Sequence, residues 1–320
     1  MPVWKDLLKT NITSWKALSQ YLEWTSVDKE QLVEKPSFRL NIPRRLARKM
    51  GKNTLEDPLL LQFIPLQTKK SSLPISSDPL QEFRFQKCPR ILHKYRGRAL
   101  FVTTSACAMH CQYCFRQNFP YEKDKASLEA AFGYIEKTTS LREIILSGGD
   151  PLSLDDPMLD YILTRLSSIP HINKLRFHTR FPVGIPERIT PSFLTLLRKT
   201  APQIVFVLHI NHPKEWDDDL ATSLRSIQRL GIPVLTQTVL LRKVNDSART
   251  LQDLFTKVSD QGILPYYLHQ LDLVKGSEFL HVPKEEGLLI MEELRNALPG
   301  YAVPRYAQEI PGKQAKTLLF

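Results

Sequence analysis

The sequence predicts an α/β fold, a partial (β/α)6 TIM-like barrel that is open on one side and preceded by a helical N-terminal extension. From residue 98 onward, six β-rich runs alternate with helical patterns, which is the arrangement that parallel βα units produce. A closed barrel of this type has eight units, so six units indicate an incomplete barrel. Several runs end in polar residues, and the active site of a βα barrel lies at the carboxyl ends of its strands.

The expected elements follow the chain in order. The β-rich runs cover residues 98–104, 143–149, 174–179, 203–210, 233–241 and 264–271. The helical patterns lie near residues 127–138, 156–168, 191–200, 215–230, 247–261 and 284–297. Before them, helical patterns lead into a polar, Ser/Pro-rich connector at 66–83. We therefore expect two domains: the N-terminal extension and connector at 1–90, and the barrel with a C-terminal segment at 91–320.

Composition indicates a protein with a large core and no membrane segment. Hydrophobic residues make up 42% of the chain, which is enough to bury a sizeable core. The net charge of +11 would suit an acidic partner, but the basic residues are scattered, so a solvated basic face explains most of it. No apolar run approaches the roughly 18 residues that span a bilayer, and the N-terminus lacks the apolar core of a secretory signal. We expect a cytoplasmic protein.

Three of the four cysteines stand close together with the spacing C-x3-C-x2-C: Cys107, Cys111 and Cys114. Cys88 stands apart and is most simply a free thiol. A structural zinc site usually takes four protein ligands, and a [4Fe–4S] cluster normally takes four cysteines, one for each iron. With three cysteines, one iron of such a cluster keeps an open coordination position. The spacing therefore favours a cluster with one vacant corner over a three-cysteine zinc site.

A second motif, "SGGDPL" at 147–152, ends the second β-rich run. Gly148 and Gly149 let the backbone approach a ligand closely, and Asp150 can accept a hydrogen bond from an ammonium group. Taken alone, these glycines would more commonly mark a strand-to-helix turn. Beside a cysteine loop of this kind, we favour ligand binding.

The cysteine motif after the first barrel strand, with Phe115 following it, resembles the signature of the radical S-adenosylmethionine (SAM) superfamily. Further segments are similar to the lysine 2,3-aminomutase family, from about Leu92 to Thr317: "HKYRGRALFVTTSACAMHCQYCFR", "GGDPL", "HINHPKE", "QTVLLRKVND", "PYYLHQLD" and "PGKQAKT". The resemblance implies a barrel of radical SAM type and three cofactors, a [4Fe–4S] cluster, SAM and pyridoxal 5′-phosphate (PLP). It also implies an external electron donor and an isomerase that acts on L-lysine.

The resemblance assigns the cluster to the three cysteines and the amino group of SAM to Gly148, Gly149 and Asp150. His209 and Gln237, at the ends of the fourth and fifth runs, are placed to contact the adenosine or methionine part of SAM. For these two residues, a polar side chain at the barrel rim, hydrogen-bonded within the protein, is the alternative.

The family's PLP-binding lysine follows a Pro-Gly turn and precedes a threonine, and Lys316 fits that register. Here "KQA" intervenes after the glycine, so Lys313 is a rival for the Schiff base. Lys94, Tyr95 and Arg98 correspond to the region that holds the cofactor phosphate. A basic strand entry that contacts solvent is the alternative for these three residues.

The resemblance also places the substrate. Arg116 aligns with an arginine that binds the substrate carboxylate, and guanidinium groups suit carboxylates because they can bond both oxygens. Asp272 and Glu309 fall at the positions that hold the ε-ammonium group, where the second residue is usually Asp in catabolic members. As alternatives, Asp272 could cap a turn and Glu309 could be an exposed charge.

The glutamate, the altered turn and the short tail after Lys316 look like the branch that makes (R)-β-lysine for translation elongation factor P (EF-P), the EF-P-(R)-β-lysylation branch, whose product a separate ligase attaches. One alternative is a catabolic lysine 2,3-aminomutase that makes free β-lysine. Others are a radical SAM RNA-modifying enzyme and a zinc-dependent nucleic-acid-binding module. On the favoured interpretation no direct nucleic-acid contact is expected.

Overall fold

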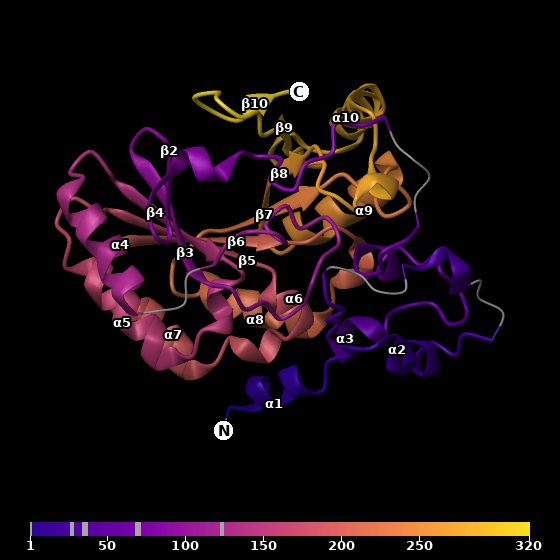
Figure 1. Ribbon diagram of the computed structural model, residues 1–320, viewed down its shortest axis with the longest axis horizontal. Helices are drawn as coiled ribbons and strands as arrows, with labels where there is room; N and C mark the ends of the chain where they lie inside the picture. Colours follow the sequence, from indigo (N-terminus) through magenta and orange to yellow (C-terminus); the bar gives the residue numbers. More distant parts are fainter. Residues whose placement is uncertain (1, 26–28, 34–37, 68–71, 122–124) are drawn as a thin grey trace.

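A single curved sheet organises the protein (Figure 1). The structure, a computed structural model, describes residues 2–25, 29–33, 38–67, 72–121 and 125–320. Within these ranges the sheet has ten strands in the order of the chain, and β1 and β10 form its two edges, so hydrogen bonds do not close it into a full barrel. Adjacent strands from β3 to β9 are parallel, whereas β1, β2 and β10 pair antiparallel with their neighbours.

The predicted six-unit partial barrel is confirmed, with small shifts at the ends of its elements. Its strands are β3 (Arg98–Thr104), β4 (Glu143–Gly148), β5 (Lys174–Thr179), β6 (Gln203–His209), β7 (Val234–Val239) and β8 (Leu264–His269). Its main helices are α4 (Lys125–Lys137), α5 (Asp156–Ser167), α7 (Pro191–Lys199), α8 (Asp218–Gln228), α9 (Ala248–Ser259) and α10 (Lys284–Ala297).

Four short strands that the sequence did not predict widen the sheet at both edges. They are β1 (Gln86–Cys88), β2 (Ile91–Tyr95), β9 (Arg305–Gln308) and β10 (Thr317–Leu318). None exceeds five residues, and in β2 and β9, the two longest, buried and more exposed positions do not alternate. They nevertheless matter for the site, because β2 carries Lys94 and Tyr95, while β9 and β10 bracket the segment from Glu309 to Lys316.

The N-terminal residues pack against the barrel rather than standing apart from it. Their helices are short: α1 (Val3–Lys9), α2 (Trp15–Tyr21), α3 (Arg44–Ala47) and the 3-10 turns η1 (Lys29–Gln31), η2 (Leu60–Gln62) and η3 (Glu82–Phe85). Trp4 meets Phe181 of α6 (Phe181–Gly184) edge to face at 5.6 Å, and both belong to one continuous apolar core. Residues 68–71 of the predicted connector lie outside the described ranges.

Side-chain caps begin four of the barrel helices. Asp155, Thr190, Asp217 and Ser247 each accept a hydrogen bond from the backbone N–H three residues later, at the starts of α5, α7, α8 and α9. Such a cap contributes about 1 kcal/mol.

In Figure 1, α4, α5, α7 and α8 lie along one side of the sheet. Across the described residues, no helix combines the length and apolar character that crossing a bilayer requires.

Along the strands, side chains that pack in the core alternate with side chains that line the cavity. In β7, Val234, Thr236 and Thr238 are buried, whereas the alternate residues Leu235, Gln237 and Val239 line an interior cavity. In β5 the cavity-lining positions are polar: Lys174, Arg176 and His178. Because side chains alternate between the two faces of a strand, this pattern directs polar groups into the barrel interior.

Candidate functional site

The cavity inside the open barrel has a volume of about 800 Å³. All the site residues predicted from the sequence line it: Lys94, Tyr95, Arg98, Cys107, Cys111, Cys114, Arg116, Gly148, Gly149, Asp150, His209, Gln237, Asp272, Glu309 and Lys316. Lys313, the rival of Lys316, is exposed and is not among the lining residues. The fold therefore gathers residues that are more than 200 positions apart in the chain around one space.

The N-terminal segment holds the cysteine loop in place. Two loop carbonyl groups accept hydrogen bonds from this segment. Ala108 O accepts from Asn11 Nδ2 at 2.8 Å, and Cys107 O accepts from Asn41 Nδ2 at 3.3 Å. The loop in turn donates from Gln112 N to Gln62 O at 2.9 Å. These contacts give the N-terminal extension a role that its sequence alone did not indicate, because they tie the cysteine loop to residues 11, 41 and 62.

The three cysteines suit an iron–sulfur cluster. Burial raises the pKa of Cys107 above its ordinary value and that of Cys114 to about 11, so both thiols lose a proton when they bind a metal. Among the described residues, no group of three or more His, Cys, Asp or Glu side chains could hold a single metal ion. A four-iron cluster does not require such a group, because each cysteine binds a different iron. Three half-buried sulfurs on one loop, facing a wide cavity, match that donor set.

Glycines join the end of β4 to the cysteine loop. Gly149 N donates to Thr104 O at 2.7 Å, and Asp150 N donates to Ala106 O at 2.8 Å. A Cβ atom on Gly149 would lie 2.3 Å from the carbonyl oxygen of Ala106, so no larger residue fits there. The backbone at these glycines therefore lies close to the cysteine loop of the chain itself, whereas the sequence predicted a close approach to a ligand.

The carboxylate of Asp150 is fully engaged within the protein. Oδ1 accepts from Thr179 Oγ1 at 2.7 Å and from Leu152 N at 3.0 Å, and Oδ2 accepts from the backbone N–H groups of Arg180 and Phe181 at 2.7 and 3.0 Å. A carboxylate offers about four acceptor positions, and all four are used. The contact predicted between Asp150 and the SAM ammonium group would have to displace one of these donors.

At the other side of the cavity, Glu309 joins three predicted cofactor residues. Its Oε2 accepts from Lys316 Nζ at 2.9 Å, and its Oε1 contacts both Lys94 Nζ and the Tyr95 hydroxyl. Burial alone would raise the pKa of Glu309, but Lys316, Lys94 and Tyr95 outweigh burial and lower it. Glu309 is therefore a paired, ionised carboxylate and not an exposed charge. Arg98 completes this group, with its guanidinium 4.5 Å from the centre of the Tyr95 ring.

Asp272 lies in the same part of the cavity but in a different electrostatic state. Burial raises its pKa from 3.8 to about 7, although the nearby charge of Lys316 opposes the shift. The two predicted ammonium-binding carboxylates thus differ: Glu309 is ionised at neutral pH, whereas Asp272 is near the midpoint of its titration.

Arg116 already binds a carboxylate that the sequence did not predict. Its Nε donates to Glu82 Oε2 at 2.8 Å, its Nη2 to Glu82 Oε1 at 2.6 Å, and its Nη1 to Ser147 Oγ at 3.2 Å. Because a guanidinium has five N–H groups, one on Nη1 and one on Nη2 have no partner among the described residues. These two N–H groups remain for a substrate carboxylate.

Neutral imidazoles surround the ends of the strands. Burial lowers the pKa of His209 to about 3, and burial also lowers the pKa values of His178 and His269 well below the ordinary value. All three line the cavity beside Gln237, so they offer hydrogen bonds without adding charge at neutral pH. No role was predicted for His178 from the sequence. The alternation of polar residues from Lys174 to Arg180 could have identified the cavity-facing side of β5.

Comparisons with known proteins identify relatives of this chain. No model of a known protein family matches the sequence. An L-lysine 2,3-aminomutase from Haemophilus influenzae is 41% identical and aligns over 98% of this chain and 95% of its own length. An L-lysine 2,3-aminomutase from Escherichia coli is 42% identical over 89% of this chain and 84% of its own length. A radical SAM methyltransferase structure from Sphaerobacter thermophilus aligns at 18% identity and a TM-score of 0.41, covering 57% of this chain and 56% of that one. The chain belongs to the lysine 2,3-aminomutase family.

Proposed function

We propose that this protein is a radical SAM isomerase that converts L-α-lysine to β-lysine by moving the α-amino group to C3. One observation carries the proposal: three cluster-type cysteines and a PLP-type lysine, with two carboxylates and an arginine between them, line a single cavity. A lysine substrate has one carboxylate and a distant ammonium group. The cavity offers a complementary group for each.

Family membership brings three cofactors, a [4Fe–4S] cluster, SAM and PLP. Together they supply the 5′-deoxyadenosyl radical and a conjugated ring that spreads unpaired spin, while the protein supplies positions. We assign the cluster to Cys107, Cys111 and Cys114. SAM then lies beside the set formed by Gly148, Gly149, Asp150, His209 and Gln237.

We assign PLP attachment to Lys316, which faces the cavity, rather than to Lys313, which does not line it. Lys94, Tyr95 and Arg98 hold the cofactor phosphate in this proposal. Their position beside Lys316, joined through Glu309, supports it.

Arg116 and Asp272 fix the two ends of the substrate lysine. Arg116 uses the N–H groups of Nη1 and Nη2 that remain after it binds Glu82 and Ser147. Asp272, with Glu309, accepts from the ε-ammonium group. Holding both ends matters because an error of about 1 Å at the reacting carbon can slow such a reaction on the order of a hundredfold.

We further propose that the product is (R)-β-lysine and that it serves the modification of elongation factor P by a separate ligase in the cytoplasm. The features that support this branch are Glu309 in place of Asp and the "KQA" insertion before Lys316. An external electron donor must reduce the cluster.

The test is anaerobic reconstitution with iron and sulfide, followed by incubation with L-lysine, SAM, PLP and a chemical reductant. We expect about four irons per chain and conversion of lysine to β-lysine, which chiral chromatography identifies as the R isomer. Omission of PLP is the control and should abolish conversion. Absence of β-lysine from a protein loaded with both cluster and PLP would refute the proposed reaction, whereas formation of the S isomer would refute the elongation factor P assignment alone.

A further inference from the structure

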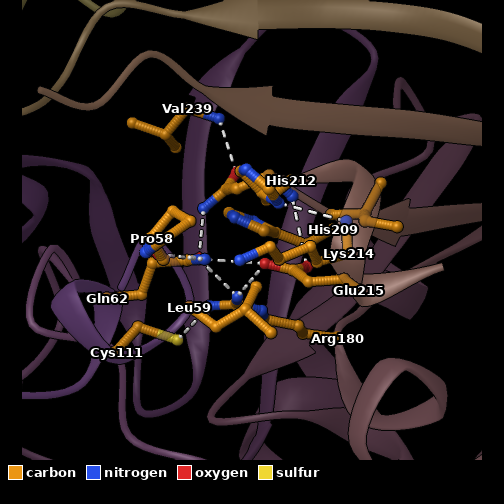
Figure 2. A network of polar contacts seen from close by, with 12 residues as sticks. Pro58, Leu59, Gln62, Cys111, Arg180, His209, His212, Lys214, Glu215 and Val239 are labelled. Atoms are coloured by element: carbon orange, nitrogen blue, oxygen red, sulfur yellow. Dashed lines mark hydrogen bonds and ion pairs between the residues drawn. The ribbon is translucent and has the colours of Figure 1, made fainter. Parts of the chain in front are cut away.

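Arg180, the residue after β5, places a buried guanidinium group against the cysteine loop (Figure 2). Its Nη1 donates to Cys111 Sγ at 2.7 Å and also donates to the hydroxyl oxygen of Tyr113. The side chain is 8% exposed, so solvent screens the contact to the sulfur only weakly.

Two residues from distant parts of the chain hold this guanidinium. Nη2 donates to Gln62 Oε1 at 2.6 Å and to Glu215 Oε1 at 3.0 Å. Gln62 Nε2 donates to the same oxygen of Glu215 at 2.8 Å, and both Gln62 and Glu215 are completely buried. Gln62 belongs to η2 in the N-terminal segment, whereas Glu215 follows β6, so the guanidinium is fixed from both sides.

The same network reaches a residue that we assign to SAM. Asn211 Nδ2 donates to the Tyr113 hydroxyl at 2.8 Å, and that hydroxyl lies 3.1 Å from His209 Nε2. Because the hydroxyl oxygen accepts from both Arg180 and Asn211, its own proton is available for His209. The contacts therefore run without interruption from Cys111 to His209.

Stability is a weak explanation for this buried ion pair, because desolvation offsets much of the attraction between buried charges. A redox role is a better one. Hydrogen bonds to the sulfurs and nearby charges set the reduction potential of an iron–sulfur cluster. Reduction adds a negative charge, so the permanently charged Arg180 favours the reduced cluster, and Glu215 acts in the opposite sense.

We propose that Arg180 is a positioning residue of the iron–sulfur site, which fixes the Cys111 sulfur and raises the reduction potential of the cluster. Gln62 and Glu215 hold it in place. This inference rests on the proposed function, because it requires that the three cysteines bind the cluster.

The experiment compares the reconstituted full-length protein with Arg180→Gln and Glu215→Gln. Arg45→Gln is the control, because Arg45 also pairs with a carboxylate, Asp217 at 2.5 Å, but does not line the cavity. Iron content is measured first. The fraction of reduced cluster is then followed by electron paramagnetic resonance during a redox titration without SAM or lysine.

We expect Arg180→Gln to lower the ratio of reduced to oxidised cluster at a fixed potential by about tenfold, which is about 59 mV for a one-electron couple. Glu215→Gln should raise this ratio, and Arg45→Gln should leave it unchanged. The opposite signs are the essential result, because loosening of the structure would not shift the potential in two directions.

A wild-type potential in a fully loaded Arg180→Gln protein would overturn the inference, as would shifts of the same sign in both variants. If Arg180→Gln binds too little iron for a redox titration, the test rests on Glu215→Gln. An unchanged or lowered ratio of reduced to oxidised cluster in that variant then refutes the inference. These outcomes leave the proposed function intact. A wild-type protein that assembles no four-iron cluster would instead refute both.

Discussion

The titration of Asp272 gives the most direct test of the proposed substrate site. Burial raises the pKa of Asp272 to about 7, whereas the cationic partners of Glu309 lower the pKa of that residue. An ammonium group binds the ionised form of a carboxylate, so the free enzyme should bind lysine better as Asp272 loses its proton. Glu309 stays ionised over the same range and should contribute no pH dependence.

The size of the effect follows from this pKa. With a pKa of about 7, the ionised fraction of Asp272 rises from about one-tenth at pH 6 to about nine-tenths at pH 8, so kcat/KM for lysine should rise about tenfold. Lys316 lowers the pKa of Asp272, so attachment of PLP to that lysine would move the midpoint upward, and the tenfold rise is a lower bound for the PLP-loaded enzyme.

The raised pKa also affects stability, with a definite sign. The folded protein holds a proton that the unfolded chain has released, so the free energy of unfolding falls as pH rises from about 4 to about 7. Removing the titration in Asp272→Asn should abolish this loss, which is at most on the order of 4 kcal/mol.

The assay measures kcat/KM for lysine from pH 6 to pH 8 in the wild-type protein, Asp272→Asn and Glu309→Gln. We expect a sloping profile for the wild type and for Glu309→Gln, and a lower, flat profile for Asp272→Asn. SAM cleavage by Asp272→Asn in the absence of lysine serves as the control for an intact cluster. A slope that persists in Asp272→Asn, or that disappears in Glu309→Gln, would show that Asp272 is not the titrating group.

Three further predictions concern the cofactors and the fold. Lys316→Ala should remove the visible absorbance band of bound PLP and Lys313→Ala should retain it; the reverse pattern would move the attachment site to Lys313. Cys111→Ala should reduce iron binding well below four per chain, and full iron content at normal yield would exclude it as a ligand. Gly149→Ala should lower the free energy of unfolding by about 2 kcal/mol or more, because the added methyl group clashes with the backbone. Gly133→Ala in α4, where an added Cβ has open space, should raise the free energy of unfolding by up to about 1 kcal/mol. Equal effects of the two substitutions would contradict the close approach at Gly149.

The barrel could be predicted because each of its units carries its own local signal. The strands from Arg98 to His269 are short β-rich runs, and helices such as α8 begin at a side-chain cap. The edge strands lacked such a signal. β10, for example, consists of Thr317 and Leu318 and exists because it pairs with β9. Pairing of this kind depends on tertiary contacts that no local pattern contains.

The candidate site divides in the same way. Cys107, Cys111 and Cys114 were predicted because their spacing can be recognised within one short segment of sequence. Lys316 was predicted through a resemblance to the family. Glu82, Gln62 and Arg180 were missed, because each acts through a partner far away in sequence: Glu82 on Arg116, 34 residues away, and Gln62 on Arg180, 118 residues away. A glutamate and a glutamine in short 3-10 turns have no distinguishing pattern before the chain folds.

The pairs within the cavity also indicate how each predicted residue can meet its ligand. Arg116 can bind a carboxylate without releasing Glu82, since two of its N–H groups have no partner among the described residues. Glu309 has only one acceptor position left, on Oε2 beside the charged Lys316 ammonium group, because Lys316 binds Oε2 while Lys94 and Tyr95 bind Oε1. Attachment of PLP to Lys316 would remove one of these donors and make Oε2 available to the substrate ammonium group. On the proposed function, Lys316 competes with the substrate ammonium group for Glu309 until the cofactor has bound, so lysine should bind the PLP-free protein more weakly than the PLP-loaded protein.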